Sequence, residues 1–362
     1  MKRIAYIDSI KGFAILLVVM GHTFHDFKGI NMAFIDFIYA FHMPLFFIIS
    51  GYLGYKKDYD INQSLFYLRN KAIGLIIPFL FFGSIYTLIY NYDYILLFTD
   101  SMKMGYWFTF SLCLIFCLYY IVEIIYSSLK NIRNQNFTYI ILLLIPYICL
   151  EYTRIYNYLS PEIYNLIGGQ NLRVYYFYFI VGILIKKYNC WAYLFSNKYL
   201  YAISILIFSV CFYTRHSNYS NYLTLIMLGT TGSFITTYFF YNNFNRIPFN
   251  NIFVNLGEKS LDIYVLHYFF LIRIPQSPIL LQDSFTSQLL SNNIEIRIFV
   301  SLILSCITIS VSYIISRIIR ENSLLSLISL GIKRNYLSIK SYGNKGNGGE
   351  SPQGSGDLRT SF

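Results

Sequence analysis

Long apolar runs follow one another along the chain, separated by short polar segments. A membrane-spanning helix needs about 20 largely apolar residues, and most of the runs approach that length. The pattern predicts an all-α, polytopic membrane bundle of about ten transmembrane helices. The predicted spans are 10–27, 34–55, 72–92, 107–129, 137–152, 174–188, 199–213, 222–241, 261–274 and 296–315.

The composition supports a lipid environment for most of the chain. Hydrophobic residues make up 56% of the 362 residues and charged residues only 12%, whereas soluble proteins carry about 25% charged residues. The mean hydropathy is +0.49. So few charges do not cover the surface of a soluble protein of this size. We therefore expect a multi-pass protein of the cell inner (cytoplasmic) membrane, with the lipid bilayer as a partner.

The basic residues indicate how the helices are oriented. The net charge is +11, which in a soluble protein would suggest a nucleic-acid partner. If the N-terminus is cytoplasmic, 20 of the 28 basic residues fall in segments on the cytoplasmic side and seven on the outer side. This asymmetry follows the positive-inside rule. It favours ten spans with both termini in the cytoplasm, and we expect no nucleic-acid partner.

The chain divides into a membrane domain and a tail. Residues 1–320 contain all the predicted spans, and residues 321–362 form a predicted cytoplasmic tail. From about residue 341 the tail is rich in Gly and Ser and lacks apolar periodicity, so we expect it to be disordered. The chain shows no internal repeat, and the inverted-repeat design of many transporters therefore has no support in the sequence.

Ionisable residues within the apolar runs are costly in a bilayer and mark candidate functional positions. Lys11 and His22 lie in the first run, eleven residues apart. That is about three helical turns, so both side chains lie on nearly one face, separated by about 16 Å along the axis. Asp8 is either an ion-pair partner of Lys11 or a helix-end charge. Alternatively, Lys11 extends to the lipid headgroups and His22 satisfies a neighbouring helix.

Two further histidines lie in other predicted spans. His42 lies in the second run, at a depth close to that of His22, and His267 lies near the middle of the ninth. The three histidines could converge from three helices. Their sequence spacing is not that of a strong metal-ligand set, so we expect no metal ion. Ser50 and Gly51 permit close helix packing in the second span.

Several segments resemble motifs of the membrane acyltransferase-3 family, whose members are integral-membrane O-acyltransferases that modify sugars and cell-envelope glycans. The family's first-helix motif pairs an Arg or Lys with a later His, as Lys11 and His22 do in YIDSIKGFAILLVVMGH. FHMPLFFIISGY, MGYWFTFSL, YFYFIVGILIKKY and LGEKSLDIYVLHYFF resemble later motifs of the family, in the same order. The resemblance covers about residues 1–320.

The resemblance implies a membrane O-acyltransferase that transfers an acetyl group from cytosolic acetyl-CoA to a hydroxyl of a cell-envelope polysaccharide or its lipid-linked precursor. It implies acyl-CoA as co-substrate, a sugar or glycan as acceptor, and no bound cofactor. His22 would be the base toward the acceptor hydroxyl or a transient acyl carrier, and Lys11 would organise the inner end of the same channel. His42, His267 and Asp8 are candidates for secondary acid–base or orienting roles.

The donor-binding residues depart from the family's pattern. Family members often carry a pair of arginines before the third helix, whereas this chain has Arg69 and Lys71 with a different spacing. These two residues are the candidates for binding the phosphates of acyl-CoA. The alternative function is that of a polytopic transporter or glycan flippase that uses the same buried polar groups without acyl transfer.

Overall fold

The structure is a computed structural model that describes residues 4–25, 33–57, 61–129, 134–152, 158–216, 222–271 and 293–332. In these ranges every regular element is a helix. The α-helices are α1 (Ala5–His25), α2 (Ala33–Gly54), α3 (Ile61–Ile89), α4 (Leu96–Thr99), α5 (Trp107–Ser128), α6 (Gln135–Tyr152), α7 (Pro161–Leu166), α8 (Gly169–Lys187), α9 (Trp191–Ser196), α10 (Lys198–His216), α11 (Tyr222–Asn243), α12 (Asn250–Glu258), α13 (Ser260–Phe270), α16 (Ile294–Glu321) and α17 (Ser323–Leu330), and the 3₁₀ helices are η1 (Lys103–Gly105) and η3 (Phe244–Arg246).

A helix lies over each range in which the sequence predicts a membrane span. Within the described residues, six helices are long and apolar enough to cross a membrane: α1, α2, α3, α5, α11 and α16. The all-helical fold is therefore confirmed, with six candidate membrane spans in the described residues where the sequence predicts ten. Membrane crossing by α6, α8, α10 and α13 stays a prediction, as does the cytoplasmic position of the termini. The predicted tail beyond residue 332 lies outside the described residues.

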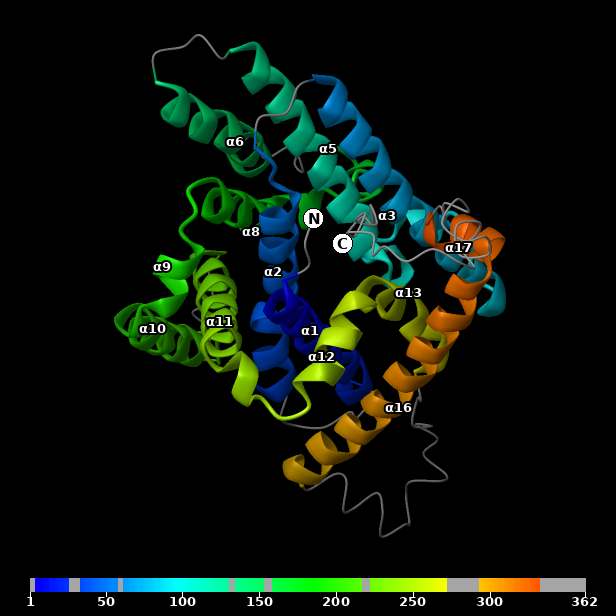
Figure 1. The fold of residues 1–362 in the computed structure, drawn as a ribbon. Coiled ribbons are helices and arrows are strands. Elements are labelled where there is room, and N and C mark those ends of the chain that lie inside the picture. Colours follow the sequence, from blue (N-terminus) through cyan, green and yellow to red (C-terminus); the bar gives the residue numbers. More distant parts are fainter. Residues whose placement is uncertain are drawn as a thin grey trace, which may run out of the picture.

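Helix α1 is the central helix of the bundle. It contacts α2, α11, α12, α13 and α16, and 83% of its apolar window is buried, compared with 28% for α16. Figure 1 shows α1 and α2 in the middle of the molecule, with α3, α5 and α6 on one side, α9 to α11 on another and α16 along a third. The helix that carries Lys11 and His22 is therefore enclosed by protein rather than by lipid.

Two glycines bring α1 and α12 into direct backbone contact. A Cβ atom at Gly12 would lie 1.9 Å from the carbonyl oxygen of Phe253, and one at Gly257 would lie 1.7 Å from the carbonyl oxygen of Asp8. Because glycine has no side chain, the two backbones approach closely, and no larger residue fits at either position. The contact fixes the first turns of α1, which carry Asp8 and Lys11, against α12.

A second pair of glycines joins α2 to α8 in the same way. A Cβ atom at Gly51 would lie 2.1 Å from the carbonyl oxygen of Phe179, and one at Gly182 would lie 2.0 Å from the carbonyl oxygen of Ile48. The close packing predicted at Ser50 and Gly51 is confirmed for Gly51. We call this contact the α2–α8 crossing.

Side-chain contacts sort the helix ends into two groups. At one end of the bundle, Tyr6 at the start of α1 and Tyr52 near the end of α2 both pack on Trp191 of α9. Asp262 near the start of α13 accepts hydrogen bonds of 2.5 and 2.9 Å from the guanidinium of Arg320 near the end of α16. We call this the basic end of the bundle.

At the opposite end, the finish of α1 meets the finish of α13 and the first half of α16. The hydroxyl of Tyr268 lies 3.1 Å from Nε2 of His22, and the hydroxyl of Ser305 donates to Oγ1 of Thr23 over 3.2 Å. We call this the histidine end. The grouping agrees with helices that alternate in direction along the chain, as the predicted spans require.

Candidate functional site

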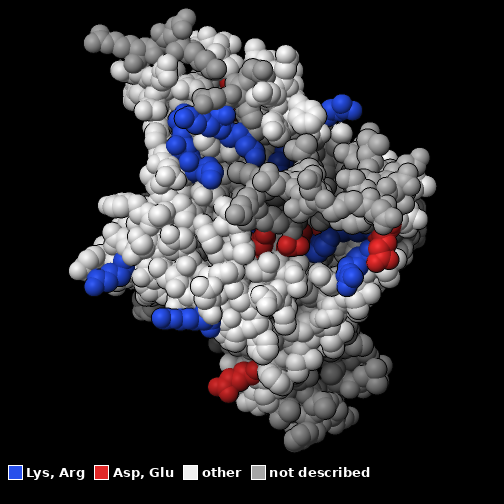
Figure 2. All heavy atoms as spheres, viewed as in Figure 1, with Lys and Arg blue, Asp and Glu red and all other residues white. Residues whose placement is uncertain are grey.

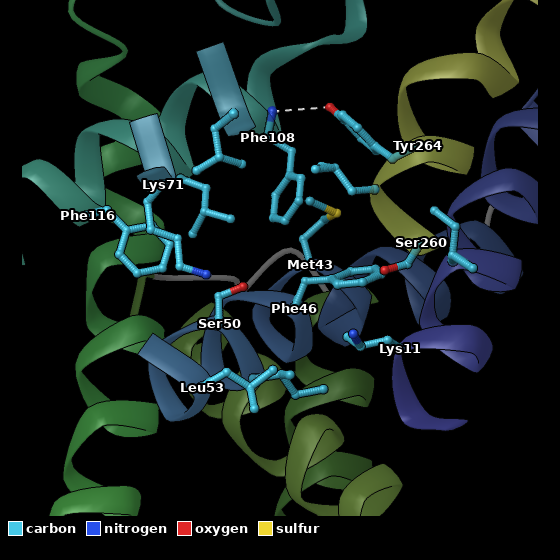
Figure 3. Close-up of a pocket in the computed structure, with 15 residues that line it drawn as sticks. Lys11, Met43, Phe46, Ser50, Leu53, Lys71, Phe108, Phe116, Ser260 and Tyr264 are labelled. Atoms are coloured by element: carbon cyan, nitrogen blue, oxygen red, sulfur yellow. Dashed lines mark hydrogen bonds between the residues drawn. The ribbon is translucent and has the colours of Figure 1, made fainter. Parts of the chain in front are cut away.

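A pocket in the core of the bundle lies between α1, α2, α3, α5 and α13 (Figure 3). Lys11 and Lys71 lie on opposite walls of it. Its atoms enclose about 600 Å³ of space, the open mouth included. The apolar lining residues are Ile15, Met43, Phe46, Ile49, Leu53, Leu75, Phe108, Leu112, Phe116 and Leu261. The pocket is thus apolar between two cations.

Lys11 is held in the pocket wall by an ion pair. Its side-chain Nζ lies 2.8 Å from Oδ1 of Asp8, and the two residues are only 5% and 7% exposed. Of the two roles predicted for Asp8, the structure shows the ion-pair partner. In so buried a pair, removal of one partner leaves an uncompensated charge. The pair therefore fixes the position of the Lys11 ammonium.

Of the two candidates for phosphate binding, the structure brings only Lys71 to the pocket. The Lys71 ammonium lies over the Phe116 ring, 5.3 Å from its centroid, and its charge interacts with those of Lys56 and Lys11. Arg69 is exposed on the surface of α3 and does not line the pocket.

Lysines gather beside the pocket at the basic end. Lys56 and Lys57 follow the end of α2, and Lys186 and Lys187 lie at the end of α8. These two pairs lie near Lys71 because the α2–α8 crossing brings the two helices together. Burial, followed by the nearby charge of Lys186, lowers the pKa of Lys56 from its ordinary value, which shows that the two pairs share one electrostatic environment. Figure 2 shows a dense group of basic side chains on this face. The basic cluster consists of Lys56, Lys57, Lys71, Lys186 and Lys187.

Aromatic rings position the lysines of the basic cluster. The Lys186 ammonium lies 4.7 Å from the centroid of the Tyr52 ring, and the Lys187 ammonium lies 3.8 Å from that of Tyr139. The Tyr139 hydroxyl donates a 2.5 Å hydrogen bond to the buried Glu123 carboxylate, which fixes that ring. A cation–π contact holds an ammonium in place without neutralising it. The cluster therefore keeps a positive field.

At the histidine end, side chains of α1 and α13 form a group of three rings. The centroid of His22 lies 5.3 Å from that of His267 and 5.1 Å from that of Tyr268. The His267 and Tyr268 centroids are 4.1 Å apart. We call His22, His267 and Tyr268 the three-ring group. His22 and Tyr268 are partly accessible, whereas His267 is fully buried.

The contacts of His267 define where its proton lies. Its Nδ1 atom is 2.6 Å from the carbonyl oxygen of Tyr264. A carbonyl only accepts, so Nδ1 carries the proton and Nε2 of the neutral ring carries the lone pair. In the described part of the chain, Nε2 has no hydrogen-bond partner. His267 thus presents a buried basic nitrogen beside His22.

His42 stands apart from the three-ring group. Its Nδ1 atom donates over 2.7 Å to the carbonyl of Ile38 in its own helix. As far as the described residues extend, its ring contact is with Tyr39, at 5.3 Å between centroids. The predicted convergence of three histidines therefore holds for His22 and His267 only.

Tyr264 connects the pocket to the three-ring group. Its ring lines the pocket, and its hydroxyl accepts a 3.1 Å hydrogen bond from the Phe108 amide (Figure 3) and donates one of 2.7 Å to the Gly105 carbonyl. Its own carbonyl holds His267. Helix α13 thus contacts α1 at both positions: Ser260, Leu261 and Tyr264 line the pocket together with Lys11, and His267 and Tyr268 pack on His22.

Tyr268 and the two lysine pairs were not among the site residues predicted from the sequence, although the lysines belong to the basic residues predicted on the cytoplasmic side. A signal for the pairs was present, because each follows a glycine of the α2–α8 crossing: Lys56 comes five residues after Gly51 and Lys186 four after Gly182. For Tyr268 the only signal was its position next to His267. Among the described side chains, no group of three or more His, Cys, Asp or Glu residues is placed to hold a metal ion.

Comparison with protein families gives one match that covers most of the chain. The family model described as acyltransferase domain matches residues 4–317. This range contains the pocket, the basic cluster and the three-ring group. Comparisons with curated proteins and with solved structures gave no match.

Proposed function

The chain belongs to the acyltransferase-3 family of membrane acyltransferases, and on that premise we propose that it transfers an acetyl group from cytosolic acetyl-CoA to a hydroxyl of a cell-envelope polysaccharide or its lipid-linked precursor. One observation carries the proposal. A pocket with lysines on both walls lies beside the basic cluster, and Tyr264 joins it to two histidines at the other end.

The donor fits the basic end by charge and shape. Acetyl-CoA carries several phosphate charges at one end and a long uncharged arm that finishes in the thioester. The basic cluster supplies ammonium groups for the phosphates, and the apolar pocket takes the uncharged arm. Lys71 lies between the two, because it belongs to the cluster and also lines the pocket. Arg69, being exposed and outside the pocket, has a minor role.

The chemistry takes place at the three-ring group. An acceptor hydroxyl is a weak nucleophile at neutral pH and needs a base within hydrogen-bond reach. His22 takes the hydroxyl proton as the oxygen attacks the thioester carbonyl. A new C–O bond forms, the C–S bond breaks, and the CoA thiolate leaves and regains a proton from the His22 imidazolium. Tyr268 orients His22 through the 3.1 Å contact, and His267 is a second acid–base group.

A covalent route uses the same residues in two steps. In the first step, His22 attacks the thioester, CoA leaves as the thiol, and an acetyl-imidazole forms. The acceptor hydroxyl then attacks the acetyl-imidazole, with Nε2 of His267 as the base. Incubation with acetyl-CoA alone separates the routes, since only the covalent route gives labelled protein without acceptor.

The charges also set the proposed orientation. The basic end faces the cytoplasm, because acetyl-CoA is cytosolic and because the positive-inside rule assigns lysine-rich segments to that side. The histidine end then lies toward the outer face of the inner membrane, with both termini in the cytoplasm and the acceptor approaching from outside.

The test is acceptor-dependent consumption of acetyl-CoA. Membranes that contain the chain are incubated with acetyl-CoA, with and without the envelope glycan fraction of the source cells, and thiol release is followed. We expect release that requires the glycan, is absent from membranes lacking the chain, and matches O-acetyl groups seen on the glycan by NMR. Glycan movement across the membrane without thiol release would instead identify a flippase.

A further inference from the structure

Tyrosines from three segments form a continuous series at the histidine end. The ring centroid of Tyr86 lies 4.5 Å from that of Tyr90 and 6.3 Å from that of Tyr92. It also lies 5.9 Å from the Tyr106 centroid and 6.0 Å from that of Tyr268. The series then reaches the His22 ring through the Tyr268 hydroxyl. We call Tyr86, Tyr90, Tyr92, Tyr106 and Tyr268 the tyrosine path.

A tight turn after α3 builds the outer part of this path. Asn91 has a φ of 53°, a left-handed conformation that Asn tolerates better than most residues. The amide of Tyr90 donates to the carbonyl of Tyr86 over 3.1 Å, and that of Tyr92 donates to the carbonyl of Thr87 over 2.9 Å. The chain thus folds back, and the rings of Tyr90 and Tyr92 both return to Tyr86.

Exposure falls from the turn to Tyr86 and Tyr106, whereas Tyr268 and His22 at the end of the series are partly accessible. Tyr92 is 45% exposed and Tyr90 is 39% exposed, whereas Tyr86 is 6% exposed and Tyr106 is fully buried. Tyrosines that only anchor a helix at the lipid interface lie around the outside of a bundle. That role accounts for single exposed tyrosines, but not for a run of ring contacts that connects the exposed turn to His22.

We propose that the tyrosine path is the acceptor subsite and that it takes a sugar. The inference rests on the proposed function, because it gives the acceptor a route to His22 from the end opposite the donor. A sugar ring presents C–H groups on its faces, which stack on aromatic rings, and hydroxyls at its edge, which bond to phenolic hydroxyls. Tyrosine offers both kinds of contact on one rigid side chain. Tyr90 and Tyr92 stack on the sugar, at the exposed start of a series of ring contacts that ends at His22.

Tyr94 provides a matched control in the same loop. It is 48% exposed, its hydroxyl lies 2.9 Å from that of Ser84, and its ring packs on Phe98 at 5.9 Å between centroids. Within the described residues, Tyr94 makes no ring contact with the path. It therefore has the exposure of Tyr92 without the connection to His22.

The experiment measures sugar binding without any acyl donor. The full chain in lipid nanodiscs is titrated with two neutral probes, chitotriose and maltotriose, and binding is followed by saturation-transfer NMR. We expect the double variant Tyr90→Ala/Tyr92→Ala to bind at least one probe about tenfold more weakly, as the loss of two stacking contacts implies. The variant Tyr90→Phe/Tyr92→Phe should retain most of the affinity, and Tyr94→Ala should match the parent chain.

Three outcomes would overturn the subsite: no saccharide signal from the parent chain, an unchanged affinity in the alanine double variant, or an equal loss in Tyr94→Ala. Failure of the proposed function looks different. A chain that binds sugar through Tyr90 and Tyr92 but never releases thiol from acetyl-CoA would keep the subsite and refute acyl transfer. A chain that transfers acetyl groups but binds sugar without these tyrosines would keep the proposed function and refute the subsite.

Discussion

The two ends of the bundle carry different kinds of side-chain contact, and we propose that they recognise their ligands by different physics. The basic end holds ammonium groups over aromatic rings, where they keep their charge and act over several ångströms. The histidine end holds rings in contact, with a proton assigned to one nitrogen of His267 by a single carbonyl. A field that captures an anion tolerates small shifts of its charges. A proton transfer does not, because base and substrate must be within hydrogen-bond distance.

Loss of a group at the histidine end should therefore reduce the rate, and loss at the basic end should reduce affinity for the donor. Between the ends lies Lys11, which lines the proposed donor pocket but belongs to the same helix face as His22. Variants ranked by expected effect show whether this division holds.

The largest effect is expected for His22→Ala. Loss of the base or acyl carrier should lower kcat for acetyl transfer by about 10²- to 10⁴-fold, while the protein stays folded in the membrane. His42→Ala is the comparison within the same end and should cost far less, because His42 lies outside the three-ring group. Acetyl transfer at the parental rate by His22→Ala would refute the role of His22.

Lys11→Ala should rank second. It removes the cation from the donor pocket and leaves the buried Asp8 carboxylate unpaired, which destabilises a protein by about 3–5 kcal/mol. We expect most of the activity to be lost and the thermal unfolding temperature in detergent to fall. Lys11→Arg should retain activity because it keeps the charge.

The double variant Asp8→Asn/Lys11→Met separates the two effects of Lys11. It removes both charges together, so it should recover thermal stability without recovering transfer. Recovery of activity in this variant would show that Lys11 has only a structural role.

Lys71→Ala should have a smaller and different effect. Because Lys71 belongs to both the basic cluster and the pocket, its loss should raise the KM for acetyl-CoA about tenfold and leave kcat nearly unchanged. Arg69→Ala is the matched control, from an exposed position two residues away. Steady-state kinetics with varied acetyl-CoA measures both values. An equal rise in KM for Arg69→Ala would show that the donor binds outside the pocket.

The smallest effect is expected for Tyr268→Phe, which removes one hydrogen bond to His22 and keeps the ring. A hydrogen bond is worth about 0.5–1.5 kcal/mol net, so kcat should fall severalfold. The pH dependence of kcat should also shift, since the hydroxyl no longer contacts the imidazole. A lower kcat with an unchanged pH profile would mean that Tyr268 contributes packing alone.

Most of the fold was predictable because lipid imposes a simple constraint. Backbone groups in a bilayer must be satisfied within a helix, so each apolar run predicted a helix, and the structure has one at every predicted range. The short elements α4, α7, α9 and α12 were not predicted. Their sequences are too short for a periodic signal, and α12 depends on the fit of Gly12 and Gly257 against another backbone.

The candidate site was predictable where it contains ionisable residues, because these are costly to place in a bilayer. Lys11, His22 and His267 stood out as ionisable groups within apolar runs, and the structure places Lys11 in the pocket wall and the two histidines side by side. Tyr268 did not stand out, because tyrosine is common in this chain, with 37 residues. Which of them meets His22 depends on how α13 packs along α1, and one sequence alone does not reveal that packing.

The most direct test is two-substrate kinetics of the purified chain in nanodiscs, with labelled acetyl-CoA and the envelope glycan fraction, at low and at high salt. Salt screens the field of a partly exposed lysine cluster but has little effect on stacking and hydrogen bonds between uncharged groups. We expect labelled glycan, a KM for acetyl-CoA that rises with salt, and a KM for the glycan that stays constant. Absence of labelled glycan, or an equal rise in both KM values, would contradict this expectation.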